Sequence, residues 1–165
     1  MSPPRDQGIT SDQIPTGPLH HAKACDAAGG AAGSLRVIAG EFEGTRGPAS
    51  TFTPIELWDL VITSRDAVVE LRLPEGHAGV LFVRSGSASV GDASDERPVG
   101  AQGVAHLQQA GTVIRLRARE DDTKVLLLGG EPIDEPIAAR GPFVMNTQAE
   151  LRQANEDFTS GRMGK

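Results

Sequence analysis

The sequence has few of the residues that disulfides, metal cages and membrane spans require. Cys25 is its only cysteine, which excludes an internal disulfide and a thiolate metal cage and predicts an inert thiol. No apolar run approaches the ~20 residues that span a bilayer. Residues 1–7 lack the charged-then-apolar order of a secretory signal. We therefore expect a soluble, cytoplasmic protein that does not bind a membrane.

Positive charge is also scarce. The 165 residues include 16 Lys and Arg against 22 Asp and Glu, a formal net charge of −6. A protein that holds nucleic acid through its phosphates needs a local excess of cations. The composition therefore predicts no direct contact with nucleic acid.

Aromatic residues make up 4% of the chain, whereas glycine and proline number 20 and 11. This composition favours short strands and many turns over long helices. Apolar runs predict strands at residues 35–39, 55–62, 69–73, 80–83, 88–90, 104–109, 112–118 and 125–128. Apolar residues on both faces of 55–62 predict a strand between two layers, and Ser85-Gly86 predicts a hairpin turn. The pattern indicates an all-β antiparallel barrel or sandwich.

The sequence motifs that usually carry a reaction are missing. No Gly-rich phosphate loop opens a helix, and there is no Gly-x-Ser-x-Gly nucleophile turn. We therefore predict no catalytic residue from the pattern alone.

Two histidines, His77 and His106, lie within the predicted barrel. If both pointed inward with Glu70 or Glu75, they would form a weak metal site. The alternatives are a surface loop histidine at 77 and a hydrogen-bonded strand histidine at 106. We favour these alternatives and predict no metal ligand.

Three arginines, Arg115, Arg117 and Arg119, alternate along the strand at 112–118. Such a row is compatible with an anion site. It is also typical of a solvated strand face, which we favour because Glu120 and two aspartates follow at once.

The C-terminal part begins with a closing stretch, residues 129–146, in which three prolines and three glycines restrict the path of the chain. Thr147 and Glu150 fit a capping box, and Gly161 is a plausible stop. We therefore predict one helix at 147–161. Its expected core-facing residues, at helical spacing, are Leu151, Ala154 and Phe158.

The chain resembles the pirin family of two-cupin proteins. The motifs that carry the resemblance are Gly129-Gly130-Glu131-Pro132-Ile133-Asp134-Glu135-Pro136-Ile137, Gly141-Pro142-Phe143-Val144-Met145-Asn146-Thr147, Arg36-Val37-Ile38-Ala39-Gly40-Glu41, Thr53-Pro54 and Leu73-Pro74-Glu75-Gly76. The likeness covers nearly the whole chain but only the C-terminal half of a pirin. It implies a cupin-type double-stranded β-helix barrel with one C-terminal α-helix.

The resemblance also implies a division of the chain. Residues 1–34 resemble the linker between the two cupins of bacterial pirins, so Met1 resembles an internal methionine. Residues 35–146 correspond to the C-terminal cupin barrel, including the closing stretch 129–146, and 147–161 to the helix.

In the family, an iron ion is held in the N-terminal cupin by a His-x-His pair, another His and a Glu. Bacterial members are associated with quercetin 2,3-dioxygenase activity and the mammalian protein with transcription co-regulation. The present sequence has no His-x-His, so no ligand carries over and no cofactor is expected in this chain. We expect it to be inactive alone.

Two further hypotheses remain open. The chain is a stand-alone β-barrel module for binding or oligomerisation, or it is an independent metal-dependent oxygenase that uses His77 and His106. Because the resemblance leaves a partner domain missing, we expect a homodimer or a complex with another cupin domain. Phe143 and Met145 are the candidate partner-surface residues.

Overall fold

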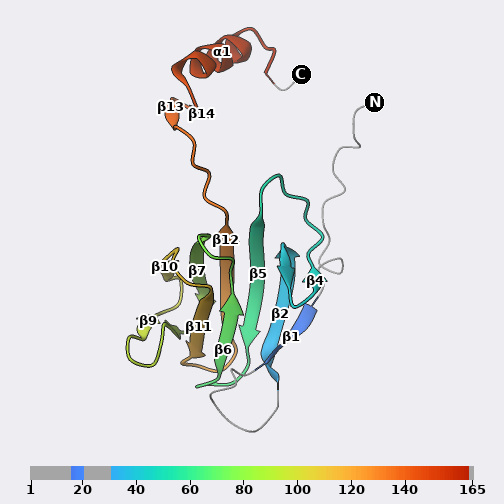
Figure 1. The fold of residues 1–165 in the computed structure, drawn as a ribbon, viewed down its shortest axis with the longest axis vertical. Helices are drawn as coiled ribbons and strands as arrows, with labels where there is room; N and C mark the ends of the chain where they lie inside the picture. The colour runs from blue at the N-terminus through green and yellow to red at the C-terminus, as the bar shows by residue number, and fades with distance from the viewer. Residues whose placement is uncertain (1–15, 21–30, 164–165) are drawn as a thin grey trace. The chain divides into compact units, whose positions relative to one another are not determined.

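The computed structural model describes residues 16–20 and 31–163. The chain forms two compact units, Met1–Pro132 and Ile133–Lys165. Residues 133–146, which we predicted to belong with the barrel, therefore group with the C-terminal helix. The first unit contains two larger β-sheets and a two-stranded hairpin, and the second contains another short hairpin and the helix (Figure 1).

The larger sheet runs through the middle of the first unit. Its order is β1-β2-β5-β12-β7-β10, and every neighbouring pair is antiparallel. The strands are β1 (Thr16–His20), β2 (Ala31–Ala39), β5 (Ile55–Ile62), β12 (Thr123–Gly130), β7 (Ala78–Ser85) and β10 (Val104–Leu107).

The smaller sheet packs against the larger one and has the order β6-β11-β8-β9. Its strands are β6 (Val68–Arg72), β11 (Val113–Ala118), β8 (Ala88–Val90) and β9 (Arg97–Val99). A separate hairpin joins β3 (Glu41–Phe42) to β4 (Thr45–Arg46).

Residues 1–34, which we predicted to be an extended, flexible lead-in resembling a linker, are partly strand. β1 lies wholly within residues 1–34, and β2 begins at Ala31, four residues before the predicted start. Tertiary pairing explains the difference, because β2 bonds to both β1 and β5. The Ala/Gly-rich part of β2 has no apolar period of its own. The rest of the lead-in lies outside the described residues.

The predicted hairpin at Ser85-Gly86 is wrong. β7 pairs with β10 and β12 in the larger sheet, whereas β8 pairs with β11 and β9 in the smaller one. The chain therefore changes sheets at Gly86, whose φ is +75°. A Cβ at Gly86 would lie 2.7 Å from Oγ1 of Thr123. A Ser-Gly turn can join two strands of a hairpin or carry the chain from one sheet to another. The local sequence therefore does not distinguish the two structures.

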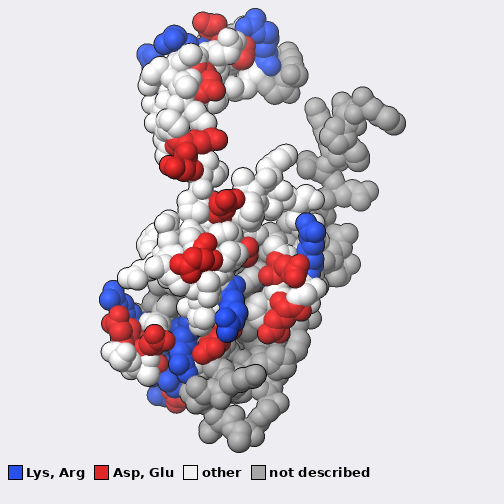
Figure 2. Space-filling view, viewed as in Figure 1, with Lys and Arg blue, Asp and Glu red and all other residues white. Residues whose placement is uncertain are grey.

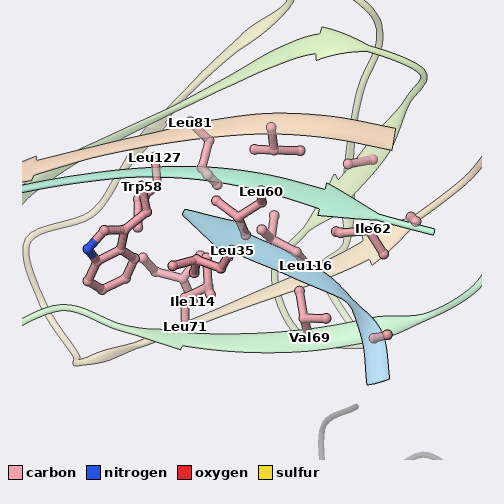
Figure 3. Packing of buried hydrophobic residues seen from close by; sticks show 14 of the residues in the cluster. Leu35, Trp58, Leu60, Ile62, Val69, Leu71, Leu81, Ile114, Leu116 and Leu127 are labelled. Carbon is pink, nitrogen blue, oxygen red and sulfur yellow. The ribbon is translucent and has the colours of Figure 1, made fainter. Parts of the chain in front are cut away.

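The two sheets enclose an apolar core (Figure 3). β5 turns Trp58, Leu60 and Ile62 inward, and all three are buried. The alternating residues of β2, β6, β7, β11 and β12 meet them; among the largest fully buried side chains are Leu35, Val37, Val69, Leu71, Leu81, Leu116 and Leu127. Each such aliphatic side chain contributes about 1.5–3 kcal/mol through burial.

The second unit contains β13 (Ala138–Arg140), β14 (Phe143–Met145) and α1 (Gln148–Thr159). The predicted capping box is present: Thr147 Oγ1 accepts from Glu150 N–H, and Glu150 accepts from Thr147 N–H. Gly161, with φ +70°, follows the helix end. Leu151 and Ala154 are buried, but Phe158 is 61% exposed, so its predicted place in the core is wrong. Among the described residues, no helix is long and apolar enough to cross a membrane.

Candidate functional site

A histidine and a glutamate, both largely shielded from solvent, form a polar pair on the inner face of the larger sheet. Nδ1 of His77, just before β7, lies 3.2 Å from Oε2 of Glu56 on β5. The side chains are 10% and 12% exposed. Gly129 of β12 is paired with Glu56 on one side and with Gly79 of β7 on the other. The pair therefore spans β12 at a glycine.

Gly129 is required there by close approach. A Cβ at Gly129 would lie 2.8 Å from Cδ2 of Leu73 and 3.3 Å from Oε2 of Glu56. We predicted that the glycines of the closing stretch permit turns. Gly129 and Gly130 instead end strand β12, and neither has a positive φ.

The prediction for His77 needs correction. It is a largely buried histidine with a carboxylate partner, not a histidine on the surface of a loop. The partner is Glu56, not Glu70 or Glu75. Glu70 is exposed on β6, and Oε1 of Glu75 accepts from the N–H of Gly111 at 3.0 Å. Sequence reasoning missed Glu56 because it lies 21 positions from His77 and only pairing through β12 brings them together.

His106 does not join this pair. It is exposed on β10, opposite Val80 of β7, whereas the next residue, Leu107, packs toward Gly79 on the inner face. Successive strand residues point to opposite faces of a sheet. His77 and His106 therefore lie on opposite faces of the larger sheet. The convergence considered for a weak metal site, which we did not favour from the sequence, is not found between these two residues.

The described residues do not form a donor set for the iron that the family resemblance implies. Such a centre needs several imidazoles and carboxylates in one place. Within residues 16–20 and 31–163, no group of three or more His, Cys, Asp or Glu could hold a metal ion. The space between the sheets is filled by aliphatic side chains and Trp58. We therefore derive no chemical step through a metal here.

The arginine row is engaged with a carboxylate. Nε of Arg117 lies 2.8 Å from Oε1 of Glu96, and Nη2 of Arg119 lies 2.5 Å from its Oε2. The hydrogen bond from Arg117, followed by the charges of the three arginines, lowers the pKa of Glu96 against the opposing effect of burial. An ion-paired face fits the favoured prediction of a solvated strand. Its acidic partner comes from residue 96, not from the acidic run at 120–122.

The outer face of the larger sheet is different, because it is mainly apolar. Phe82 of β7 lies between Val104 of β10 and Leu126 of β12, and Val80 lies beside Leu128. Val104 is 53% exposed and Leu128 is 41% exposed, while the other three are half-buried. We call these five residues the apolar face. We predicted that β5 is covered on both sides, but its outer residues Leu57 and Val61 are only half-buried.

A carboxylate lies within this surface. Asp59 of β5, opposite Leu126, is 9% exposed. Its Oδ1 accepts from Nη2 of Arg84 at 2.5 Å, and its Oδ2 lies 3.8 Å from Nη1 of Arg36. The charge is therefore compensated within the sheet.

In the second unit, the candidate partner residues Phe143 and Met145 are both half-buried. The ring of Phe143 packs edge-to-face on Phe158, with centroids 5.7 Å apart. The most exposed large apolar side chains in the unit are others, namely Ile133, Ile137, Val144 and Phe158. The role of Phe143 and Met145 as a partner surface stays a prediction.

Residues 58–164 match the family described as the Pirin C-terminal cupin domain. The chain is 38% identical over 162 residues to a Pseudomonas aeruginosa protein named "Putative quercetin 2,3-dioxygenase PA2418", covering 98% of this chain and 51% of that protein. It is 30% identical over 165 residues to "Putative pirin-like protein At3g59260" of Arabidopsis thaliana, covering 99% and 56%. The crystal structure of a quercetin 2,3-dioxygenase from Acinetobacter baumannii matches with a TM-score of 0.79 and 38% identity, over 96% of this chain and 50% of that one.

These matches identify the fold formed by the two packed sheets as a cupin barrel. The chain belongs to the pirin family, as the resemblance in its closing stretch predicted. It spans about half the length of the curated relatives named above.

Proposed function

We propose that this chain is a cytoplasmic, non-catalytic cupin module that works by binding a second cupin domain through its apolar face. The observation that carries the proposal is the contrast between the outer faces of its two sheets. The smaller sheet presents Glu70, Arg72 and the ion-paired arginines. The larger sheet presents Val80, Phe82, Val104, Leu126 and Leu128.

A solvated face of an antiparallel sheet is normally polar. The smaller sheet follows this rule, whereas the larger one sets the apolar face beside the polar residues Asp59, Arg84 and His106. Contiguous exposed apolar surface, flanked by polar residues, marks a site of interaction with another protein. Asp59 is compatible with such a site, because its carboxylate stays hydrogen-bonded to Arg84 when a partner covers it. A buried charge without a partner would be strongly destabilising.

We propose that the partner bound by the apolar face is a second copy of this chain. The outer face of the larger sheet extends beyond the apolar face onto β2 and β5. Its five strands, β2, β5, β12, β7 and β10, are spaced ~4.8 Å apart and about seven residues long at ~3.3 Å each, which gives roughly 450 Å² for the whole outer face. A symmetric pair would bury roughly 900 Å², close to the ~1,000 Å² expected of a weak biological interface. The relatives are about twice as long as the chain, and a pair would match their size.

The test uses two valines of equal exposure on different sheets. Val104, on the apolar face, is 53% exposed, and Val113, on the smaller sheet, is 49% exposed. We expect the full chain to dimerise with a dissociation constant on the order of 1–100 µM. Val104→Glu should abolish the dimer, because two carboxylates would be desolvated, while Val113→Glu should leave it intact. Sedimentation velocity across a concentration series measures both.

Two results would contradict the proposed dimer. One is a monomer at millimolar concentration for the unmodified chain. The other is a dimer that Val104→Glu does not weaken. A dimer weakened equally by both variants would also count against the apolar face.

The alternative function is a quercetin 2,3-dioxygenase-type activity, which the names of the relatives favour. We expect the purified chain to hold less than stoichiometric iron, nickel, copper and zinc after dialysis and to consume no quercetin. Stoichiometric metal that is lost in His77→Ala or His106→Ala would overturn the non-catalytic proposal. It would restore an independent oxygenase as the function.

A further inference from the structure

A second feature lies at the side of the barrel, where the β3–β4 hairpin approaches β6. A niche of about 280 Å³ opens there. It is lined by Glu41, Phe42, Glu43, Trp58, Glu70 and Arg72. None of these residues belongs to the apolar face, so the niche is independent of the proposed function.

One residue that lines the niche, Trp58, has a buried hydrogen-bond donor without an acceptor. Trp58 is 2% exposed, and its Nε1 has no hydrogen-bond partner. Figure 3 shows the indole at one end of the core, with its nitrogen turned away from Leu60 and Leu116. A buried donor left unpaired costs about 1–3 kcal/mol. Buried indole N–H groups usually find a partner, so this atom indicates a missing acceptor.

The β3–β4 hairpin packs on the indole of Trp58. The ring of Phe42 packs edge-to-face on Trp58, with centroids 5.2 Å apart. The hairpin turns through Glu43 and Gly44, whose φ values are +46° and +79°. A positive φ is uncommon for a residue other than glycine. Because Nε1 is buried and Phe42 packs on the indole, a ligand that reaches this atom must change the surroundings of Trp58.

The rim of the niche is charged. Glu41, Glu43, Glu70 and Arg72 are all exposed, and none takes part in an ion pair among those found in the described residues. Figure 2 shows acidic side chains gathered over the region that β4 and β6 occupy in Figure 1, with basic ones beside them. The rim thus offers three carboxylate acceptors and one guanidinium donor.

We infer that this niche binds a small, neutral, polyhydroxylated ligand of the monosaccharide class. A simple cation offers no acceptor to the indole N–H, and three carboxylates repel an anion. A hydroxyl group both donates and accepts, so several hydroxyls on one ring satisfy the carboxylates, Arg72 and Trp58 together. The apolar C–H face of a sugar ring packs on the half-buried ring of Phe42. The niche has the size of the smallest ligand sites, which begin near 300 Å³.

The chain carries a built-in reporter for this site. Trp58 is the only tryptophan, and the sequence contains no tyrosine, so fluorescence excited near 295 nm comes from the niche alone. D-glucose, D-galactose and D-xylose should each be titrated into the full chain to 100 mM, with putrescine and acetate as a cationic and an anionic probe. We expect a saturable change in emission with at least one sugar and none with putrescine or acetate.

Variants decide whether the signal belongs to the niche. Arg72→Gln and Glu70→Gln should each lower the affinity for the sugar at least tenfold. Glu131→Gln, at an exposed position outside the niche, should leave that affinity unchanged. The proposal is overturned if no sugar gives a saturable change, if putrescine or acetate alone does, or if the three variants bind equally. A folded state for each variant is checked by its unfolding transition, and a variant that fails to fold is replaced by Phe42→Leu.

Discussion

His77 and Glu56 meet across a strand that belongs to neither of them. Nδ1 of His77 lies 3.2 Å from Oε2 of Glu56, and β12 passes between their strands at Gly129. The contact exists because position 129 has no side chain. Any side chain there would displace Leu73 and press on the Glu56 carboxylate.

Gly129→Ala should therefore destabilise the barrel by about 1–3 kcal/mol, the usual cost of overpacking. Gly130→Ala is the matched control, because a Cβ there would make only an ordinary contact, 3.4 Å from the carbonyl oxygen of Pro54. Urea unfolding measures both variants. An equal loss of unfolding free energy in the two variants would contradict the close-approach argument. It would indicate that both glycines matter for backbone freedom instead.

The ion pairs of Glu96 should make stability depend on pH. Its pKa is lowered in the folded chain, and an unfolded Glu titrates near about 4.3. The ionised group stabilises the fold fully above that value, and this contribution is lost as pH falls through the lower, folded pKa. Glu96→Gln should reduce the decline in unfolding free energy between about pH 5 and pH 3. An unchanged decline would show that Glu96 is not responsible.

The helix of the second unit should depend on its cap. Thr147→Ala removes the acceptor for the N–H of Glu150 and should cost about 0.5–2 kcal/mol. Thr147→Ser keeps a hydroxyl and should cost little. Amide hydrogen exchange within α1 isolates this effect from the barrel. Similar exchange in both variants would mean that the box adds nothing to helix stability.

The two rings of the second unit should couple modestly. Because Phe158 is 61% exposed, Phe158→Ala should cost less than the ~3–5 kcal/mol of a core phenylalanine. A double-mutant cycle with Phe143→Ala should give a coupling of about 0.5–1.5 kcal/mol. If Phe158→Ala instead costs as much unfolding free energy as a core phenylalanine, the original prediction that Phe158 is buried would be supported.

Much of the fold was readable from local pattern. The alternation in β6 and β11 predicted which residues face the core, because strand side chains have a period of two. The capping box of Thr147 and Glu150 was equally direct, since its partners are three residues apart. The predictions failed where pairing was long-range. Gly86 turns the chain into another sheet, and β1 and the start of β2 are strands only because neighbours bond to them.

The candidate sites were less readable. His77 was predicted to lie on a loop surface, its partner Glu56 was not predicted, and neither was the niche around Trp58. Phe42 and Arg72 come from different elements and have no shared motif. Nothing in a linear sequence marks an indole N–H that will be buried without an acceptor.

The sequence by itself determined the class of structure, the core faces of the strands, the capped helix and membership of the pirin family. These depend on spacing of a few residues and on a long, specific motif. Tertiary structure alone decided that His77 and His106 lie on opposite faces, that Glu96 engages the arginine row and that one sheet keeps an apolar outer face. Those outcomes depend on which strands pair and in which register, and a shift of one residue in register would reverse every face.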